Sequence, residues 1–89
     1  MTRRGTLEIY LDVLGILGRE GEMTRTRMMY ASNLAWVPFK RCLSKLEELE
    51  LIKTRREEHG GRTRCLYSLS DKGRRVQDLS RAMKMLMKA

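Results

Sequence analysis

The sequence has 89 residues, enough for one small domain, and its 19 Lys and Arg against 11 Asp and Glu give a formal net charge of +8. This excess of basic residues favours a polyanion as the partner. A catalytic role has no support, because the chain has one histidine, lacks a phosphate-binding glycine motif and is too small for a lined cleft. We therefore expect neither enzymatic activity nor a cofactor.

No segment of the sequence predicts membrane insertion or export. The most apolar run, residues 7–17, contains Glu8 and Asp12 and is far shorter than the ~20 apolar residues that a membrane span needs. The cysteines, Cys42 and Cys65, lie far apart rather than in a close pair, so buried free thiols are favoured over a zinc site with His59. We expect a cytoplasmic, nucleoid-associated protein without a metal and without membrane contact.

The first predicted helix begins at Thr6, whose hydroxyl is a candidate cap, and is ended by Gly18 and Gly21. Its apolar residues recur at spacings of three and four, which predicts a buried face: Leu7, Tyr10, Leu14 and Leu17. Its acids are Glu8, Asp12, Glu20 and Glu22. We expect this acidic segment to face away from a nucleic acid.

Two further helices are predicted around a tight turn at Asn33, which tolerates a left-handed backbone. Met23 is expected in a brief strand, Thr24 caps a helix over 25–31, and a third helix runs from about 36 to 50. Its apolar face consists of Phe39, Cys42, Leu43, Leu46 and Leu49. The offsets of Met29, Phe39 and Cys42 from the turn predict a helix-turn-helix, with a helical hairpin in a small α-bundle as the alternative.

Two strands are predicted next, over residues 51–56 and 63–69, with a loop over 57–62 that contains Gly60 and Gly61. A hairpin after a helix-turn-helix predicts an α+β fold, the winged helix-turn-helix. Ser70 is expected to cap a last helix. The organisation is then a flexible arm over residues 1–5, a domain over 6–69 and a C-terminal helix over 70–89.

The exposed face of the third helix offers donors for phosphates and guanine edges, and its start offers apolar groups for a thymine methyl. The donors are Lys40, Arg41, Ser44 and Lys45, and the apolar residues are Trp36 and Val37. The alternatives are a solvated polar face and, for Trp36, which we expect to bury most of its surface, packing between helices. Arg25 and Arg27 of the second helix join this candidate set.

The hairpin, or wing, contributes a second group of candidates for contact with the DNA backbone. These are Arg55, Arg56, His59, Gly60, Arg62 and Arg64, with Lys53 beside them. Glycines let the turn approach a sugar-phosphate chain closely. The alternative is a surface loop that Glu57 and Glu58 neutralise by pairing with Arg55 and Arg62.

Residues 5–73 resemble the small basic winged-helix proteins of archaea. The matching phrases are Tyr10-Leu11-Asp12-Val13-Leu14, residues 26–34, Phe39-Lys40-Arg41 with Leu43 and Leu46, and residues 67–73. The resemblance implies DNA binding, as a transcriptional regulator or chromatin-type protein, and dimerisation through the last helix. Two positions depart from the family pattern, since Ala35 replaces the usual Ser or Asn cap and Glu50 replaces a Gly.

We therefore predict a double-stranded DNA-binding transcriptional regulator. The alternatives are a nucleoid protein without sequence preference and a winged-helix module that binds only proteins. The last helix predicts a homodimer, because its apolar residues are spaced as in a coiled-coil seam: Val76, Leu79, Met83 and Leu86. The alternative is that this helix folds back onto the first helix of its own chain.

Overall fold

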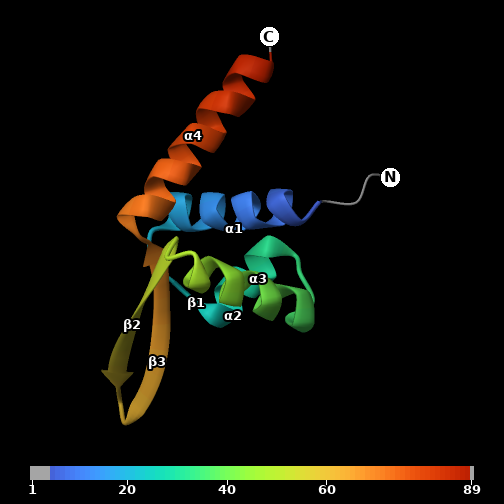
Figure 1. Ribbon diagram of the computed structural model, residues 1–89. Helices are drawn as coiled ribbons and strands as arrows, with labels where there is room; N and C mark the ends of the chain where they lie inside the picture. The colour runs from blue at the N-terminus through green and yellow to red at the C-terminus, as the bar shows by residue number, and fades with distance from the viewer. Residues whose placement is uncertain (1–4, 89) are drawn as a thin grey trace.

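Figure 1 shows the computed structural model of the chain, which describes residues 5–88. The elements in order are α1 (Thr6–Glu20), β1 (Met23–Thr24), α2 (Arg25–Ser32), α3 (Trp36–Glu48), β2 (Ile52–His59), β3 (Arg62–Leu69) and α4 (Asp71–Met87). The strands form one antiparallel sheet in the order β1-β3-β2. This arrangement confirms the predicted α+β fold. Of the expected flexible arm, only Gly5 falls within the described residues.

The hydrophobic core lies between the three N-terminal helices and the base of the sheet. Leu14 of α1, Met28 of α2 and Phe39 of α3 are almost completely buried, and Tyr67 of β3 packs in the same cluster. Met28 is therefore the residue of α2 that packs fully into the core of the helix-turn-helix. Met29, which the sequence predicted for this contact, is half-buried. The two methionines are consecutive in a helix of eight residues, which is too short for apolar periodicity to separate them.

The ends of α1 differ from the prediction. Thr6 is the first helical residue and caps nothing, since Gly5 holds the cap position without a side-chain hydrogen bond. Gly18 lies inside the helix, which ends at Glu20, and the predicted Gly21 follows as its C-cap with φ of 87°. A Cβ at Gly18 would lie 3.2 Å from the side chain of Gln77, so this glycine lets α4 pack closely against α1.

The turn between α2 and α3 follows the prediction. Thr24 caps α2 by accepting a hydrogen bond from the Arg27 amide at 3.4 Å. Asn33 adopts the left-handed conformation, with φ of 57° and ψ of 38°. The third helix begins at Trp36 without a side-chain cap and ends at Glu48, two residues before the predicted end, and Glu50 follows with a positive φ of 60°.

The hairpin is tighter than the predicted loop over 57–62. Strands β2 and β3 pair up to His59 and Arg62, so only Gly60 and Gly61 form the turn. Their φ values are 58° and 78°, and a two-residue turn with positive φ at both positions suits the twist of a hairpin. Leu66 of β3 is buried, with 7% of its surface exposed.

Only the first turns of α4 belong to the core. Val76 is half-buried against the core cluster, whereas Leu79, Met83 and Leu86 are 66%, 60% and 80% exposed. The helix crosses α1 near its own start and then projects away from the body, on the side opposite the hairpin (Figure 1). Folding back onto α1 therefore covers part of α4 and leaves its apolar face open.

Cys42 and Cys65 are both free thiols in different surroundings. Cys42 is 3% exposed, and burial raises the pKa of its thiol to about 11. Cys65 is half-buried. Because the thiolate is the reactive form, we expect an alkylating reagent at pH 8 to modify Cys65 in the native protein and Cys42 only after unfolding. Mass spectrometry of the wild type, Cys42→Ser and Cys65→Ser checks this, and fast labelling of Cys42 would contradict its burial.

Candidate nucleic-acid interface

The outward face of α3 forms a shallow groove of ≈ 540 Å³ with α1. It is lined by Tyr10, Trp36, Val37, Lys40, Arg41, Ser44, Lys45 and Glu48. The structure thus brings together all six residues that the sequence placed on this face. Lys40, Arg41 and Ser44 are exposed, while Lys45 is half-buried and lies 3.8 Å from Glu48. This face can donate hydrogen bonds from three cations, one of them partly neutralised.

Trp36 and Val37 remain open to solvent at the start of α3. Their exposed fractions are 46% and 56%. The ring of Trp36 lies 6.4 Å from that of Phe39, measured between centroids. Trp36 therefore buries just over half of its surface, partly against Phe39 and Arg25, and the rest of the indole is available to a partner.

Arg25 connects three elements at the edge of this groove. Its guanidinium lies 5.9 Å from the centroid of the Trp36 ring and donates a hydrogen bond to the Tyr67 hydroxyl at 3.2 Å. That hydrogen bond is the main cause of a raised Arg25 pKa. Arg27 is exposed and its side chain points to no ion-pair partner among residues 5–88. Neither arginine is paired with a carboxylate within residues 5–88, and Arg25 lies beside α3.

On the wing, carboxylates engage two of the predicted basic residues. Arg55 donates two hydrogen bonds to Glu22, at 2.9 and 2.8 Å, and lies 3.6 Å from Glu57. Arg64 lies 3.3 Å from the same Glu57. The hydrogen bond to Arg55 lowers the pKa of Glu22 and raises that of Arg55. Glu22 therefore faces the wing, contrary to the expectation that the acidic segment faces away.

Arg56 and Arg62 are the exposed wing arginines that make no ion pair within the described part of the chain. The pairing of Glu58 with Arg62 that the sequence suggested is absent there. Arg56 lies opposite Cys65 in the register, and Arg62 lies opposite His59. Because side chains alternate along a strand, Arg56 and Arg62 project from opposite faces of the hairpin. His59 and Gly60 are exposed at its tip.

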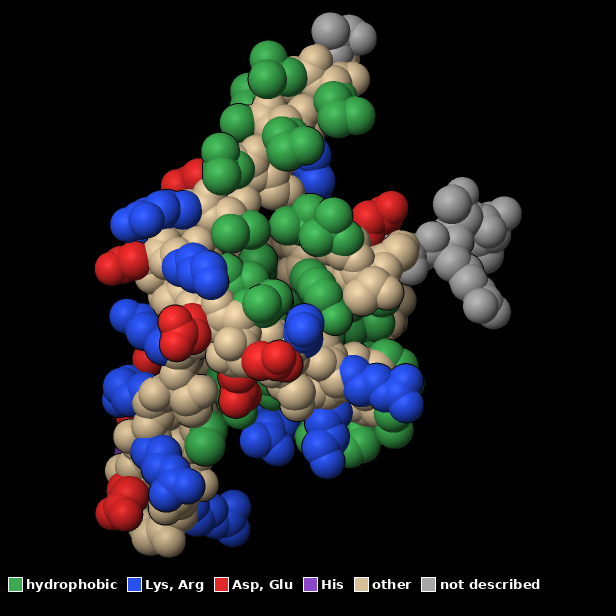
Figure 2. Space-filling view, in the orientation of Figure 1, with side chains coloured by type: hydrophobic (Ala, Val, Ile, Leu, Met, Phe, Trp, Pro, Cys, Tyr) green, Lys and Arg blue, Asp and Glu red, His purple; other side chains and the backbone are tan. Residues whose placement is uncertain are grey.

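Figure 2 shows how the two kinds of surface are separated. Hydrophobic side chains gather along one side of α4 and over the adjoining part of α1, while Lys and Arg side chains lie over the hairpin, the opposite edge of the helical body and the other side of α4. The apolar side of α4 and the basic hairpin therefore lie at opposite ends of the molecule in this view. A polyanion at one end would leave the other end free.

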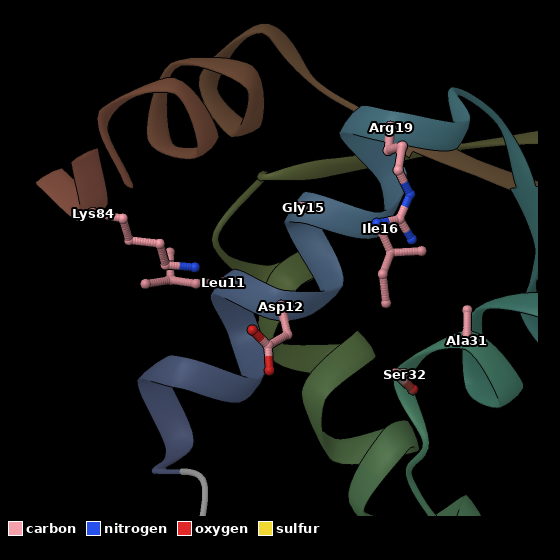
Figure 3. A pocket seen from close by; sticks show the side chains of 8 residues that line it. All are labelled: Leu11, Asp12, Gly15, Ile16, Arg19, Ala31, Ser32 and Lys84. Carbon is pink, nitrogen blue, oxygen red and sulfur yellow. The ribbon is translucent and has the colours of Figure 1, made fainter. Parts of the chain in front are cut away.

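A second hollow, of ≈ 380 Å³, lies between α1, α2 and α4 and is shown in Figure 3. Its polar lining comes from Asp12, Arg19, Ser32 and Lys84. The Ser32 hydroxyl donates to the Met29 carbonyl at 2.9 Å and is buried, so it is no exposed nucleophile. Within residues 5–88, no three His, Cys, Asp or Glu side chains gather where a metal ion could bind, and no helix there could cross a membrane.

Sequence reasoning missed three residues of this region. Tyr10 was assigned to the buried face of its helix yet lines the α3 groove, Tyr67 was given no role in the site, and Glu22 was expected to face away from a nucleic acid. The polar end of a tyrosine usually finds a partner at a boundary, which is the one general signal that pointed to Tyr10 and Tyr67. Nothing in the sequence near Glu22 indicated Arg55.

Comparisons with known proteins agree with this geometry. A family model described as winged helix-turn-helix matches residues 3–88. An uncharacterised protein of Methanocaldococcus jannaschii is 36% identical over 56 residues, which are 63% of this chain and 57% of that relative. The chain therefore matches little more than half of that relative's length.

Solved structures also share the fold. The smu.1704 protein of Streptococcus mutans has a TM-score of 0.82 at 21% identity, covering 98% of this chain and 85% of its own. Sso10a-2, described as a DNA-binding protein from Sulfolobus solfataricus, has a TM-score of 0.74 at 22% identity, covering 96% and 83%. ZitR of Lactococcus lactis, described as a zinc-responsive MarR family member, has a TM-score of 0.69 at 27% identity, covering 91% and 61%.

Proposed function

This chain belongs to the winged helix-turn-helix family, which is not a family of enzymes, and we propose that it binds double-stranded DNA as a transcriptional regulator. The observation that carries the proposal is the open basic face of α3, flanked by Arg25 and the wing. Sso10a-2, which shares the fold, is itself a DNA-binding protein. Bound to the chromosome, the protein would be cytoplasmic and nucleoid-associated.

In the proposed complex, residues 36–48 enter the major groove. A groove about 12 Å wide admits one α-helix, and the exposed side chains of α3 then meet the base edges. Lys40 and Arg41 would donate to guanine or phosphate, Ser44 would accept or donate at a base edge, and Val37 and the open face of Trp36 would contact a thymine methyl. Lys45, which lies near Glu48, would contact the backbone.

The remaining cations have backbone roles in this proposal. Arg25 and Arg27 at the start of α2 would bind phosphates beside the groove, and Arg62 with His59 and Gly60 would meet the adjoining backbone at the wing tip. Arg56 reaches out from the other face of the hairpin. Arg55 and Arg64 contribute less, because an incoming phosphate has to compete with Glu22 and Glu57 for them.

A salt titration of binding to a mixed-sequence duplex tests the proposal. Because each neutralised phosphate releases counterions, the logarithm of the binding constant should fall by about 0.9 per phosphate for each unit of log salt. A winged-helix module that binds only proteins would show no DNA binding even at low salt. Selection from a random duplex pool then separates a regulator, which enriches one sequence, from a nucleoid protein, which enriches none.

Variants of the helix and of the wing should behave differently. Lys40→Ala and Arg41→Ala should each cost about 1 to 3 kcal/mol on the preferred sequence and relax the preference at one base pair. Arg62→Ala should weaken binding to all sequences alike and flatten the salt slope by roughly one unit, with Arg56→Ala acting likewise if its face meets the duplex. Arg55→Ala is the matched control, since its charge is already paired, and a uniform loss from the helix variants would reject recognition by α3.

We also propose that the chain is a homodimer in which residues 6–69 bind DNA and the helix over 70–88 provides the interface. The support is the exposed seam of Leu79, Met83 and Leu86, together with an apolar groove between α1 and α4. A two-fold dimer presents two copies of α3, so we expect a palindromic site with half-sites about one helical turn apart.

A further inference from the structure

Arg25 is held differently from the arginines of the wing. Arg55 and Arg64 are engaged by carboxylates, whereas Arg25 makes no ion pair within residues 5–88 and is held by two uncharged groups, the Tyr67 hydroxyl and the Trp36 ring. An arginine held by neutral groups has a fixed position, and no carboxylate neutralises its charge. This combination suits an external anion.

Tyr67 is the rigid member of this group. It is 3% exposed and lies on the central strand of the sheet, paired with Met23 on one side and Thr54 on the other. Backbone pairing on both edges of β3 fixes the strand, and burial fixes the ring that carries the hydroxyl. Arg25 is an exposed side chain, so without the contact to Tyr67 it would be far less restricted. The hydrogen bond of 3.2 Å from the Arg25 guanidinium to this hydroxyl restricts the rotation of the Arg25 side chain.

Arg25 is exposed and lines a hollow at the start of α2. A guanidinium has five N–H donors, and the contact with Tyr67 leaves most of them available. Beside it lies a hollow of ≈ 330 Å³ lined by Thr24, Arg25, Thr26, Arg64 and Cys65. The N-terminus of α2 forms part of the lining of this hollow, and the positive end of a helix dipole favours an anion.

We propose that Tyr67 is a positioning residue for DNA binding, which holds the Arg25 guanidinium over Trp36 so that it clamps one backbone phosphate beside the recognition helix. The proposal rests on the DNA binding proposed above. The phenol touches no DNA itself. It lowers the ordering cost of Arg25 before the duplex arrives, as preorganised groups do in other interfaces.

A double-mutant cycle between Tyr67→Phe and Arg25→Ala tests this. Affinity for one duplex is measured across a series of salt concentrations, with thermal unfolding of each free variant. Tyr67→Phe should weaken binding about two- to tenfold, the range expected for one hydrogen bond, with the same number of phosphates contacted. In the Arg25→Ala background the same change should have no effect. Tyr30→Phe, which removes an exposed hydroxyl of α2, is the matched control and should bind like the wild type.

The outcomes separate the possible failures. Wild-type affinity of Tyr67→Phe, or an equal loss in both backgrounds, would overturn the positioning role. Absence of DNA binding by the wild type at low salt would instead reject the proposed function as a whole. If Tyr67→Phe does not fold, Arg25→Lys is the second test, because lysine keeps the positive charge but lacks the planar guanidinium. Arg25→Lys should keep the salt slope and lose affinity for the duplex. Wild-type affinity of this variant would overturn the proposal.

Discussion

Replacing Gly73 with alanine will destabilise the domain by about 3 kcal/mol, the upper part of the usual range for a group forced into a packed site. Gly73 lies in the first turn of α4, against the chain between α3 and β2. A Cβ there would overlap the carbonyl oxygen of Leu51. Because the overlap is with backbone, no side-chain rotation relieves it, and α4 has to move away.

The cost of that movement is high because several hydrogen bonds meet at this junction. The Ser70 hydroxyl accepts from the Gly73 amide at 3.0 Å and donates to the Glu50 carbonyl at 2.6 Å. The Ser70 amide donates to Leu51 at 3.1 Å, and Lys72 donates to the Leu49 carbonyl at 2.9 Å. Displacing α4 weakens this whole set together.

Thermal or urea unfolding of the free protein measures the effect. For a domain of this size, 1 kcal/mol shifts the midpoint by about 4 to 8 °C, so Gly73→Ala should melt well over 10 °C lower. Gly15→Ala is the matched control, because its Cβ would meet nothing within 4 Å inside α1. Alanine there should stabilise by about 0.5 to 1 kcal/mol through helix propensity. Equal midpoints for Gly73→Ala and the wild type would show that α4 is not seated on Leu51.

The helices were predictable because their signals are local. Apolar spacing identified Phe39, Cys42 and Leu46 as the buried face of α3, and the left-handed Asn33 followed from its chemistry. The junction at Gly73 was not predictable as a contact, since the glycine and Leu51 meet only after the hairpin returns the chain to α3. Neighbouring residues in the sequence give no signal for this contact between Gly73 and Leu51.

The candidate site was predictable in its residues and not in their partners. The spacing of apolar residues located the exposed basic face of α3, and its predicted residues line one groove. The contacts that decide how each arginine is used join residues far apart in sequence, such as Arg55 with Glu22 and Arg25 with Tyr67. Such pairs depend on which strands become neighbours, so composition alone made all wing arginines look equivalent.

The double substitution Leu79→Lys/Met83→Lys will convert the proposed dimer into a monomer. These residues are 66% and 60% exposed on the side of α4 that continues into the apolar groove with Leu7 and Leu11 of α1. A seam shorter than three heptads is marginal alone, so the groove on α1 has to contribute to the interface with a second copy. Introducing two ammonium groups there leaves charges unpaired in an apolar contact, which is strongly unfavourable.

Sedimentation equilibrium at micromolar concentration measures the mass of the protein in solution. Binding to duplexes with one or two half-sites measures whether the protein prefers two half-sites. The wild type should be a dimer that prefers two half-sites, whereas the double variant should be a monomer that binds both duplexes alike. Asp78→Lys is the control, because it adds a lysine on the exposed polar side of α4 and should leave the dimer intact. A monomeric wild type would reject the dimer. A double variant that stays dimeric would place the interface elsewhere, on the exposed face of α1, and the half-site preference would then survive the loss of the seam.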